Sequence, residues 1–176
     1  FEGSMLTIAP AAVKLMNLIY SYNVDQTKFC WTMPDGFRVE TTSTSTETVK
    51  GYFMDHSGKT HEGTCEVKLE EYNKFSRALA PNIIHSVDAY FGREVIKRCY
   101  FDVSFIHDSF GCHPNHALEL QQIVREVAAM ILESDLLIDI LAQISPEQTA
   151  YNVRKGKLSK GSLSVDDVLS SEYIVR

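Results

Sequence analysis

The spacing of hydrophobic residues predicts four amphipathic helices along the chain. In each of the four stretches apolar residues recur every three or four positions, so that they fall on one face of a helix. The stretches are Pro10–Tyr22, Asn82 to about Arg98, Pro114 to about Glu133, and Asp135–Ile144. The third has the clearest pattern, and its predicted buried face consists of Leu120, Ile123, Val124, Val127 and Ile131.

The helix predicted from Asn82 is delimited at its start by Pro81. The residue before a proline avoids the helical region, so Ala80 is expected to end the preceding segment. Asn82 is then placed to cap the new helix through its side chain. The expected buried face of this helix is Ile84, Val87, Phe91 and Val95.

Near the end of the chain, a capping signal predicts a shorter helix. Ser164 is a favourable N-cap residue, and Asp166 and Asp167 follow in the first turn, where negative charge interacts well with the helix dipole. The polar and basic segment Val153–Gly161 before it is expected to be a loop. Ser145-Pro146 is expected to open a turn or a short helix.

Two shorter apolar stretches in the first third of the chain predict a strand pair. Phe29–Thr32 and Phe37–Thr42 flank the segment Met33-Pro34-Asp35-Gly36, where proline presets φ and glycine accepts positive φ. The following segment, Thr41–Thr48, is rich in Ser and Thr and poor in apolar residues. We expect it to form an exposed connection.

A second predicted hairpin comes next. Val49–Met54 and Thr60–Leu69 flank a turn in which Gly58 supplies the conformational freedom. The segment Glu70–Leu79 that follows is expected to be helical or irregular.

A third strand, turn and strand are predicted over Phe101–Gly111, and they contain the main candidate for chemistry. Phe101, Val103 and Phe105 alternate with polar residues, as in a half-buried strand, and the strand ends at His107-Asp108-Ser109. A carboxylate fixed at a turn between apolar strands is what metal-assisted phosphoryl chemistry requires. Taken alone, the pattern fits an ordinary turn aspartate equally well.

The order of these elements predicts an α+β fold. Strands come in local pairs between helices, without the regular strand and helix alternation of a parallel sheet, which favours a small antiparallel sheet backed by helices. The length of 176 residues suits one domain. We assign that domain to residues 6–176, because residues 1–5, Phe-Glu-Gly-Ser-Met, look like an artificial junction or the edge of a gap.

Charge and cysteine content restrict the possible functions. The formal net charge of −6 argues against a free-standing nucleic-acid binder held by bulk electrostatics. It leaves room for a catalytic module whose partner supplies the basic surface. The four cysteines show no CxxC spacing, so free thiols in a reducing compartment are expected. No transmembrane helix is predicted, so a membrane partner is not expected.

Two further groups of side chains have a plain structural interpretation. Cys112, His113 and His116 lack a second ligand pair at zinc-site spacing, so a structural or incidental use is expected. The basic residues Arg93, Lys97 and Arg98 at the end of one predicted helix are compatible with phosphate contact or with ordinary solvated charge.

Four segments of the chain resemble the phage-type single-subunit DNA-dependent RNA polymerases, and they occur in the family's order. They are Trp31–Phe37 (WTMPDGF), Ala80–Ala89 (APNIIHSVDA), Ile106–Gly111 (IHDSFG) and Gly161–Tyr173 at the end of the chain. The third resembles the family's polymerase motif C, and its His-Asp-Ser rather than His-Asp-Glu favours RNA polymerases over the related DNA polymerases. The resemblance extends from about residue 10 to the C-terminus.

The resemblance implies a right-hand polymerase palm and gives roles to particular residues. Asp108 would be one of two aspartates that hold two Mg²⁺ ions. His107 would lie beside the growing RNA 3′ end, and His85 would reach the minor groove of the template–product duplex. Independently of the resemblance, Asp88 stands three positions after His85 on nearly the same helix face, so we expect it to support His85 by orienting its imidazole. Ser109 is expected to stabilise the turn.

The same resemblance shows what this sequence lacks. The family's other metal-binding aspartate and its nucleotide-binding fingers helix have no counterpart here. We therefore expect a DNA template, an RNA product, nucleoside triphosphates and a second polypeptide or missing segment as partners, in the cytoplasm of an infected bacterial host. The alternatives are a DNA-polymerase-like palm and a degenerate, non-catalytic palm that acts as a binding module.

Overall fold

The computed structural model describes residues 9–22, 28–42, 44–72, 78–107 and 109–171. Its elements confirm the predicted α+β class. The helices are α2 (Pro10–Ser21), α3 (Leu79–Arg98), α4 (Ala117–Glu133), α5 (Leu136–Ile144), α6 (Pro146–Arg154) and α7 (Val165–Ser170), with a 3₁₀ turn at Pro114–His116. The strands are β1 (Lys28–Thr32), β2 (Arg38–Thr42), β3 (Thr44–Met54), β4 (Thr60–Tyr72), β5 (Val103–Ile106) and β6 (Ser109–Cys112).

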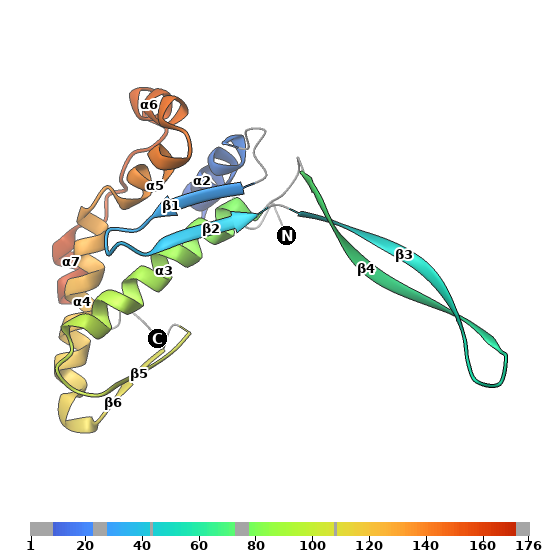
Figure 1. Cartoon of the computed structure of the whole chain (residues 1–176). Coiled ribbons are helices and arrows are strands. Elements are labelled where there is room, and N and C mark those ends of the chain that lie inside the picture. The colour runs from blue at the N-terminus through green and yellow to red at the C-terminus, as the bar shows by residue number, and fades with distance from the viewer. Residues whose placement is uncertain (1–8, 23–27, 43, 73–77, 108, 172–176) are drawn as a thin grey trace.

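The described strands pair as separate antiparallel hairpins rather than as one sheet. β1 pairs with β2, β3 with β4, and β5 with β6. The hairpin β1–β2 lies along α3 and the hairpin β5–β6 lies along the same helix elsewhere, so α3 is the element that holds the fold together (Figure 1).

The larger core cluster lies where β1 meets α2, α3 and α5. Alternate residues of β1 point inward, and Trp31 is 2% exposed. Around it pack Tyr22, Ile83, Ile140 and Leu141, all fully buried. Burial of side chains of this size contributes about 1.5–3 kcal/mol each, so this cluster fixes β1–β2 against α3.

The buried face of α3 differs from the predicted one. Ile84 is 50% exposed, while Ile83 is fully buried together with Leu79, Ala80, Ser86 and Tyr90. Ile83 and Ile84 are adjacent and equally hydrophobic, so local spacing does not decide which of them is buried. The packing of β1–β2 against α3 buries Ile83. Val95 is buried as predicted, and Val87 and Phe91 are partly buried.

The predicted cap of this helix is also corrected. α3 begins at Leu79, two residues before Pro81, because proline is tolerated within a first turn. Asn82 therefore lies inside the helix and caps nothing. Its side-chain Nδ2 donates to Thr41 Oγ1 (2.7 Å) and ties α3 to β2 instead.

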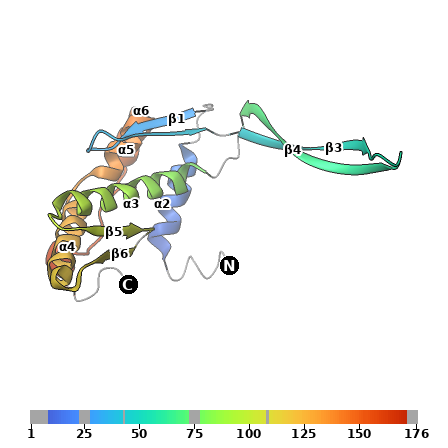
Figure 2. The ribbon, with the colours of Figure 1, turned by 60° about the horizontal axis from the view of Figure 1, so that its bottom comes forward.

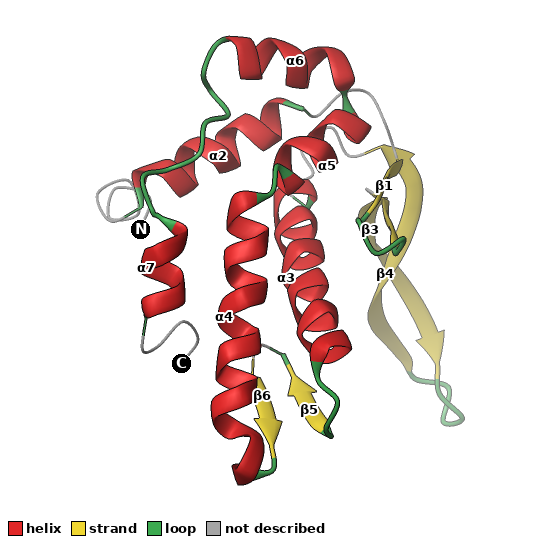
Figure 3. Ribbon diagram, turned by 90° about the vertical axis from the view of Figure 1, so that its left-hand side faces the viewer, coloured by secondary structure: helices red, strands yellow, loops and turns green. Residues whose placement is uncertain are grey.

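The second core cluster joins α3 to α4, which lie side by side (Figure 3). The predicted face of α4 is confirmed, since Leu120, Ile123, Val124 and Val127 are buried and Ile131 is partly buried. The hairpin β5–β6 packs against this cluster through Val103 and Phe110. It is thereby fixed to the helical body.

The hairpin β3–β4 is longer than predicted and projects away from the rest of the molecule (Figure 1). The expected connection at Thr41–Thr48 is mostly strand, because β3 begins at Thr44. β4 likewise continues to Tyr72, where a helical or irregular segment was expected. Threonine favours extended backbone, and here cross-strand partners compensate for the lack of apolar residues. The turn forms as predicted, with Gly58 at φ 83°.

The C-terminal helix confirms its capping signal. Ser164 accepts a hydrogen bond from the Asp167 backbone N–H (3.1 Å), and the Asp167 side chain accepts from the Ser164 N–H (3.2 Å). This reciprocal capping box starts α7, which packs against α4. None of the helices in the described ranges is long and apolar enough to span a bilayer.

Candidate functional site

The tip of the β5–β6 hairpin holds the segment that the sequence singles out for chemistry. Ile106 pairs with Ser109 across the hairpin. His107 has φ 56° and is the one non-glycine residue with positive φ in the part of the chain that the structure describes. Histidine tolerates this left-handed conformation better than most residues. His107 and Ser109 are exposed. Asp108, the predicted metal ligand, lies outside the described residues.

Aromatic rings fix this hairpin on α3. The Phe105 ring stacks on Phe110 with centroids 4.7 Å apart, and Phe110 meets Phe91 of α3 edge to face at 5.9 Å. Phe105 lies directly against the backbone of Gly92. Three rings and one glycine therefore set where the hairpin crosses the helix.

The hairpin tip points along the face of α3 that carries His85 and Asp88. β5 runs antiparallel to α3, so its tip is directed toward the Leu79 end of the helix (Figures 1 and 2). Asp88 and His85 stand four and seven residues before Gly92, hence on the same face. Along the hairpin, His107 lies two residues and therefore about 7 Å beyond Phe105. Along α3, Asp88 lies four residues and therefore about 6 Å from Gly92, in the same direction.

His107 is thus brought level with Asp88. Asp88 and His85 are exposed, like His107. All three predicted site residues are therefore open to solvent, as is Ile106, which is 65% exposed.

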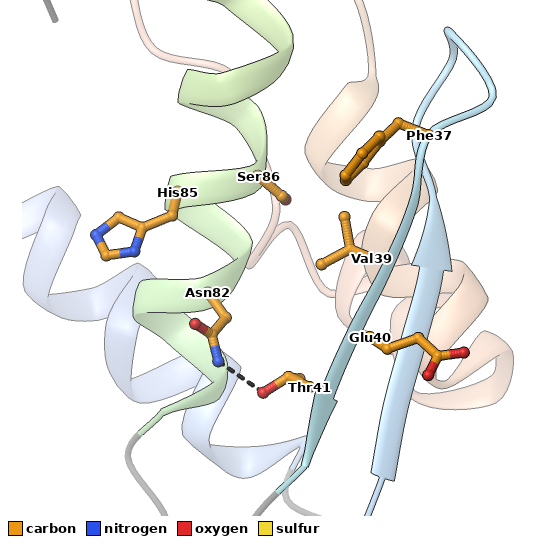
Figure 4. Close-up of a pocket in the computed structure, with 7 residues that line it drawn as sticks. All are labelled: Phe37, Val39, Glu40, Thr41, Asn82, His85 and Ser86. Atoms are coloured by element: carbon orange, nitrogen blue, oxygen red, sulfur yellow. Dashed lines mark hydrogen bonds between the residues drawn. The ribbon is translucent and has the colours of Figure 1, made fainter. Parts of the chain in front are cut away.

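The expected ion pair between His85 and Asp88 is not formed. Among the contacts of the described residues, no hydrogen bond or ion pair joins these two side chains. His85 instead borders a groove of about 420 Å³ between β2 and α3 (Figure 4). The groove is lined by Phe37, Val39, Glu40, Thr41, Asn82, His85 and Ser86. Asp88 therefore does not orient the imidazole in this structure.

A network of polar contacts joins the segment Trp31–Phe37 to α3. Trp31 Nε1 donates to Ser86 Oγ (3.1 Å), and Ser86 Oγ donates to the Ile83 carbonyl (2.7 Å). Arg93 donates from both Nε and Nη2 to the two carboxylate oxygens of Asp35. Its guanidinium also lies 4.5 Å from the centroid of the Phe37 ring. Two of the four segments singled out in the sequence are therefore in direct contact.

Asp35 and Arg93 are structural residues that the sequence did not reveal. The Asp35 side chain is 4% exposed, and the hydrogen bond from Arg93 holds the pKa of its carboxyl below the usual range. The sequence assigned Arg93 only to phosphate contact or to solvent. Its partner is 58 positions away in the chain, and no local signal connects the two.

The Cys112, His113 and His116 group forms no metal site. His113 Nδ1 accepts from the Asn115 N–H (3.3 Å), and the His116 ring stacks on Phe101 at 4.4 Å. Within the described ranges, no group of three or more His, Cys, Asp or Glu side chains is arranged to hold a metal ion.

Comparison with known proteins gives a family for the chain. Residues 6–165 match the model of the family described as DNA-dependent RNA polymerase. The DNA-directed RNA polymerase of Enterobacteria phage T3 is 30% identical over 109 residues, and so is the T7 RNA polymerase of Escherichia phage T7. Each match covers 57% of this chain and 12% of the relative, so the chain corresponds to a small part of these proteins.

Proposed function

Because the chain belongs to the family of phage-type single-subunit DNA-dependent RNA polymerases, we propose that residues 6–176 form the C-terminal palm portion of such an enzyme. The complete enzyme would join a nucleoside triphosphate to the 3′ hydroxyl of an RNA chain, copy a DNA template and release pyrophosphate. The observation that carries the proposal is the family match over residues 6–165, which includes the hairpin with His107 and Asp108.

Asp108 is the proposed metal-binding and catalytic residue of this portion. A carboxylate is the protein ligand that Mg²⁺ prefers. Bound Mg²⁺ would supply charge neutralisation on the transferring phosphates and a lower pKa for the attacking hydroxyl. The hairpin would hold the carboxylate in place, because its strands are packed on α3 through Phe105 and Phe110.

His107 and His85 are the proposed nucleic-acid contacts. Both imidazoles are exposed, and the β5–β6 hairpin points toward the half of α3 that contains His85. An imidazole N–H can donate to base and sugar acceptors in a minor groove. Ser109 would support the turn. Asp88 is proposed to act only as a nearby charge, since it does not bond to His85 here.

A second polypeptide or further segment would complete the active site. The second aspartate and the residues that bind the incoming nucleotide are not found in this sequence. The net charge of −6 also requires that most of the basic surface for DNA and RNA comes from elsewhere. On this proposal the 176 residues cannot elongate RNA alone.

Primer extension tests this proposal against its alternatives. The chain alone should extend no primer, whereas the enzyme assembled with its remaining polypeptide should extend an RNA primer on DNA with ribonucleotides. A preference for deoxynucleotides would favour a DNA-polymerase-like palm. Binding of nucleic acid or of a partner without extension in any assembly would favour a non-catalytic module.

Substitution of His107 separates its backbone role from its side-chain role. His107→Gly should keep the hairpin, because glycine relieves a left-handed conformation that costs other residues about 1–2 kcal/mol. The elongation rate should nevertheless fall about tenfold, the equivalent of one hydrogen bond of about 1.4 kcal/mol. Single-turnover elongation and the melting temperature measure the two effects.

His107→Asn is the matched comparison. Asparagine also tolerates positive φ and keeps a hydrogen-bond donor, so it should lose less activity than glycine. If the glycine variant elongates at the wild-type rate, then the imidazole makes no productive contact.

A further inference from the structure

Gly92 lies at the closest approach between α3 and the β5–β6 hairpin. A Cβ placed on Gly92 would stand 2.4 Å from Cε1 and from Cζ of Phe105, far inside the contact distance of any real methyl group. Gly92 is also buried. It does not serve a left-handed turn, since it lies in the middle of a 20-residue helix. Glycine there costs about 1 kcal/mol relative to alanine, so its presence is explained by the Phe105 ring above it.

The Phe105 ring has little room to turn away. It is also stacked on Phe110, with ring centroids 4.7 Å apart and an interplanar angle of 21°. Phe110 in turn packs edge to face on Phe91, one residue before Gly92 in α3. A side chain at position 92 would therefore displace the aromatic group as a unit. The ring would need to move by about 1 Å to reach ordinary contact.

The displacement would be carried to the tip of the hairpin. Phe105 pairs with Phe110, and the next pair, Ile106 and Ser109, is the last before the tip. Only one ladder pair thus separates the ring that rests on Gly92 from His107. The helix face that contains Gly92 also carries Asp88 and His85, which lie one and two turns closer to the start of α3.

We propose that Gly92 is a positioning residue of the polymerase. By letting Phe105 sit directly on the helix backbone, it sets the height of the described part of the hairpin, up to His107, above the face of α3. The proposal rests on the proposed function and names a determinant of its geometry. A misplacement of 1 Å in groups that orient a reaction can reduce its rate about 100-fold.

The test uses the polymerase assembled with all its polypeptides. Gly92→Ala should lower the elongation kcat about 100-fold while KM for the nucleotide stays within about twofold, since the nucleotide-binding residues lie elsewhere. Phe105→Leu in the Gly92→Ala background makes room for the methyl group. The double variant should elongate at least tenfold faster than Gly92→Ala alone.

Gly51→Ala is the control. Gly51 lies in β3, outside the proposed site, and a Cβ placed on it would meet nothing within 4 Å. Its elongation rate should stay within about twofold of the wild type. Backbone hydrogen exchange over β5–β6 gives a second readout that does not depend on activity. Gly92→Ala should speed this exchange, Gly51→Ala should not, and Phe105→Leu should partly restore slow exchange in the double variant.

The outcomes separate this proposal from the proposed function. Wild-type elongation and exchange in Gly92→Ala would overturn the positioning role. The positioning role would also be overturned if the double variant elongated no faster than Gly92→Ala, or if neither variant assembled. An assembled wild-type protein that never elongates would overturn the polymerase function, while the exchange data would still decide whether Gly92 positions the hairpin.

Discussion

Replacement of Asp108 by Asn in the assembled polymerase is expected to abolish elongation while template binding persists. The amide keeps the size of the side chain but removes the negative charge that would hold Mg²⁺. We expect at least a 1000-fold lower rate, which corresponds to about 4 kcal/mol of lost transition-state stabilisation. Elongation from a primed template measures the rate, and fluorescence anisotropy of the labelled template measures binding.

Asp102→Asn provides the control for this substitution. Asp102 is exposed and directly precedes β5, so the variant removes the same charge from the same hairpin. Its rate should stay near that of the wild type. Elongation by Asp108→Asn at an undiminished rate would remove Asp108 from the active site and, with it, the proposed motif C.

Arg93→Met should cost the largest amount of folding stability among single charge removals on α3. It leaves the Asp35 carboxylate, 4% exposed, without its two strongest donors, and Lys97 Nζ at 3.9 Å compensates only in part. Breaking a buried pair costs about 3–5 kcal/mol. We expect about 3 kcal/mol, because Arg93 keeps 29% of its side chain exposed. Thermal denaturation should show a melting temperature lower by roughly 6–12 °C.

Arg98→Met is the comparison on the same helix. Arg98 pairs with Glu94 one turn away near the surface, and such pairs are worth no more than about 1 kcal/mol. If the two variants lost the same free energy of unfolding, the Arg93–Asp35 pair would contribute no more to stability than the surface pair Arg98–Glu94.

Acid titration gives an independent signature of the pair. The pKa of Asp35 is lowered in the folded protein, mainly by its hydrogen bond to Arg93. Its stabilising effect is therefore complete above the unfolded value of about 3.9 and is lost as the pH falls through the folded pKa. The stability difference between wild type and Arg93→Met should narrow below pH 4 in the same measurements. A difference that stays constant to pH 2 would contradict this assignment.

Local signals predicted most of the fold. The face of α4, the turn at Gly58 and the cap at Ser164 depend on residues within a few positions of each other, and all three are confirmed. On α3 the prediction failed at one position, where Ile83 is buried instead of Ile84, because the two residues are equally apolar and only packing in the folded chain distinguishes them. The strand start at Thr44 was missed since its stability comes from partners in β4.

The proposed site residues could be named from the sequence because they form compact motifs. His85, Asp88, His107, Asp108 and Ser109 stand out there, and those that the structure describes are exposed. The contacts that hold them were not visible, because Asp35 and Arg93, or Gly92 and Phe105, are distant in the chain. No local sequence pattern predicts that Gly92 of α3 will contact the Phe105 ring of β5.

The long β3–β4 hairpin can vary without disturbing the packing of its neighbours. In the chain it lies between β2 and α3, and α3 is tied to the β1–β2 hairpin through Asn82–Thr41, Trp31–Ser86 and Asp35–Arg93. None of these three contacts uses a residue of β3 or β4. The entropy cost of closing a loop grows only slowly with its length, so the length and sequence of β3–β4 can change while these contacts remain.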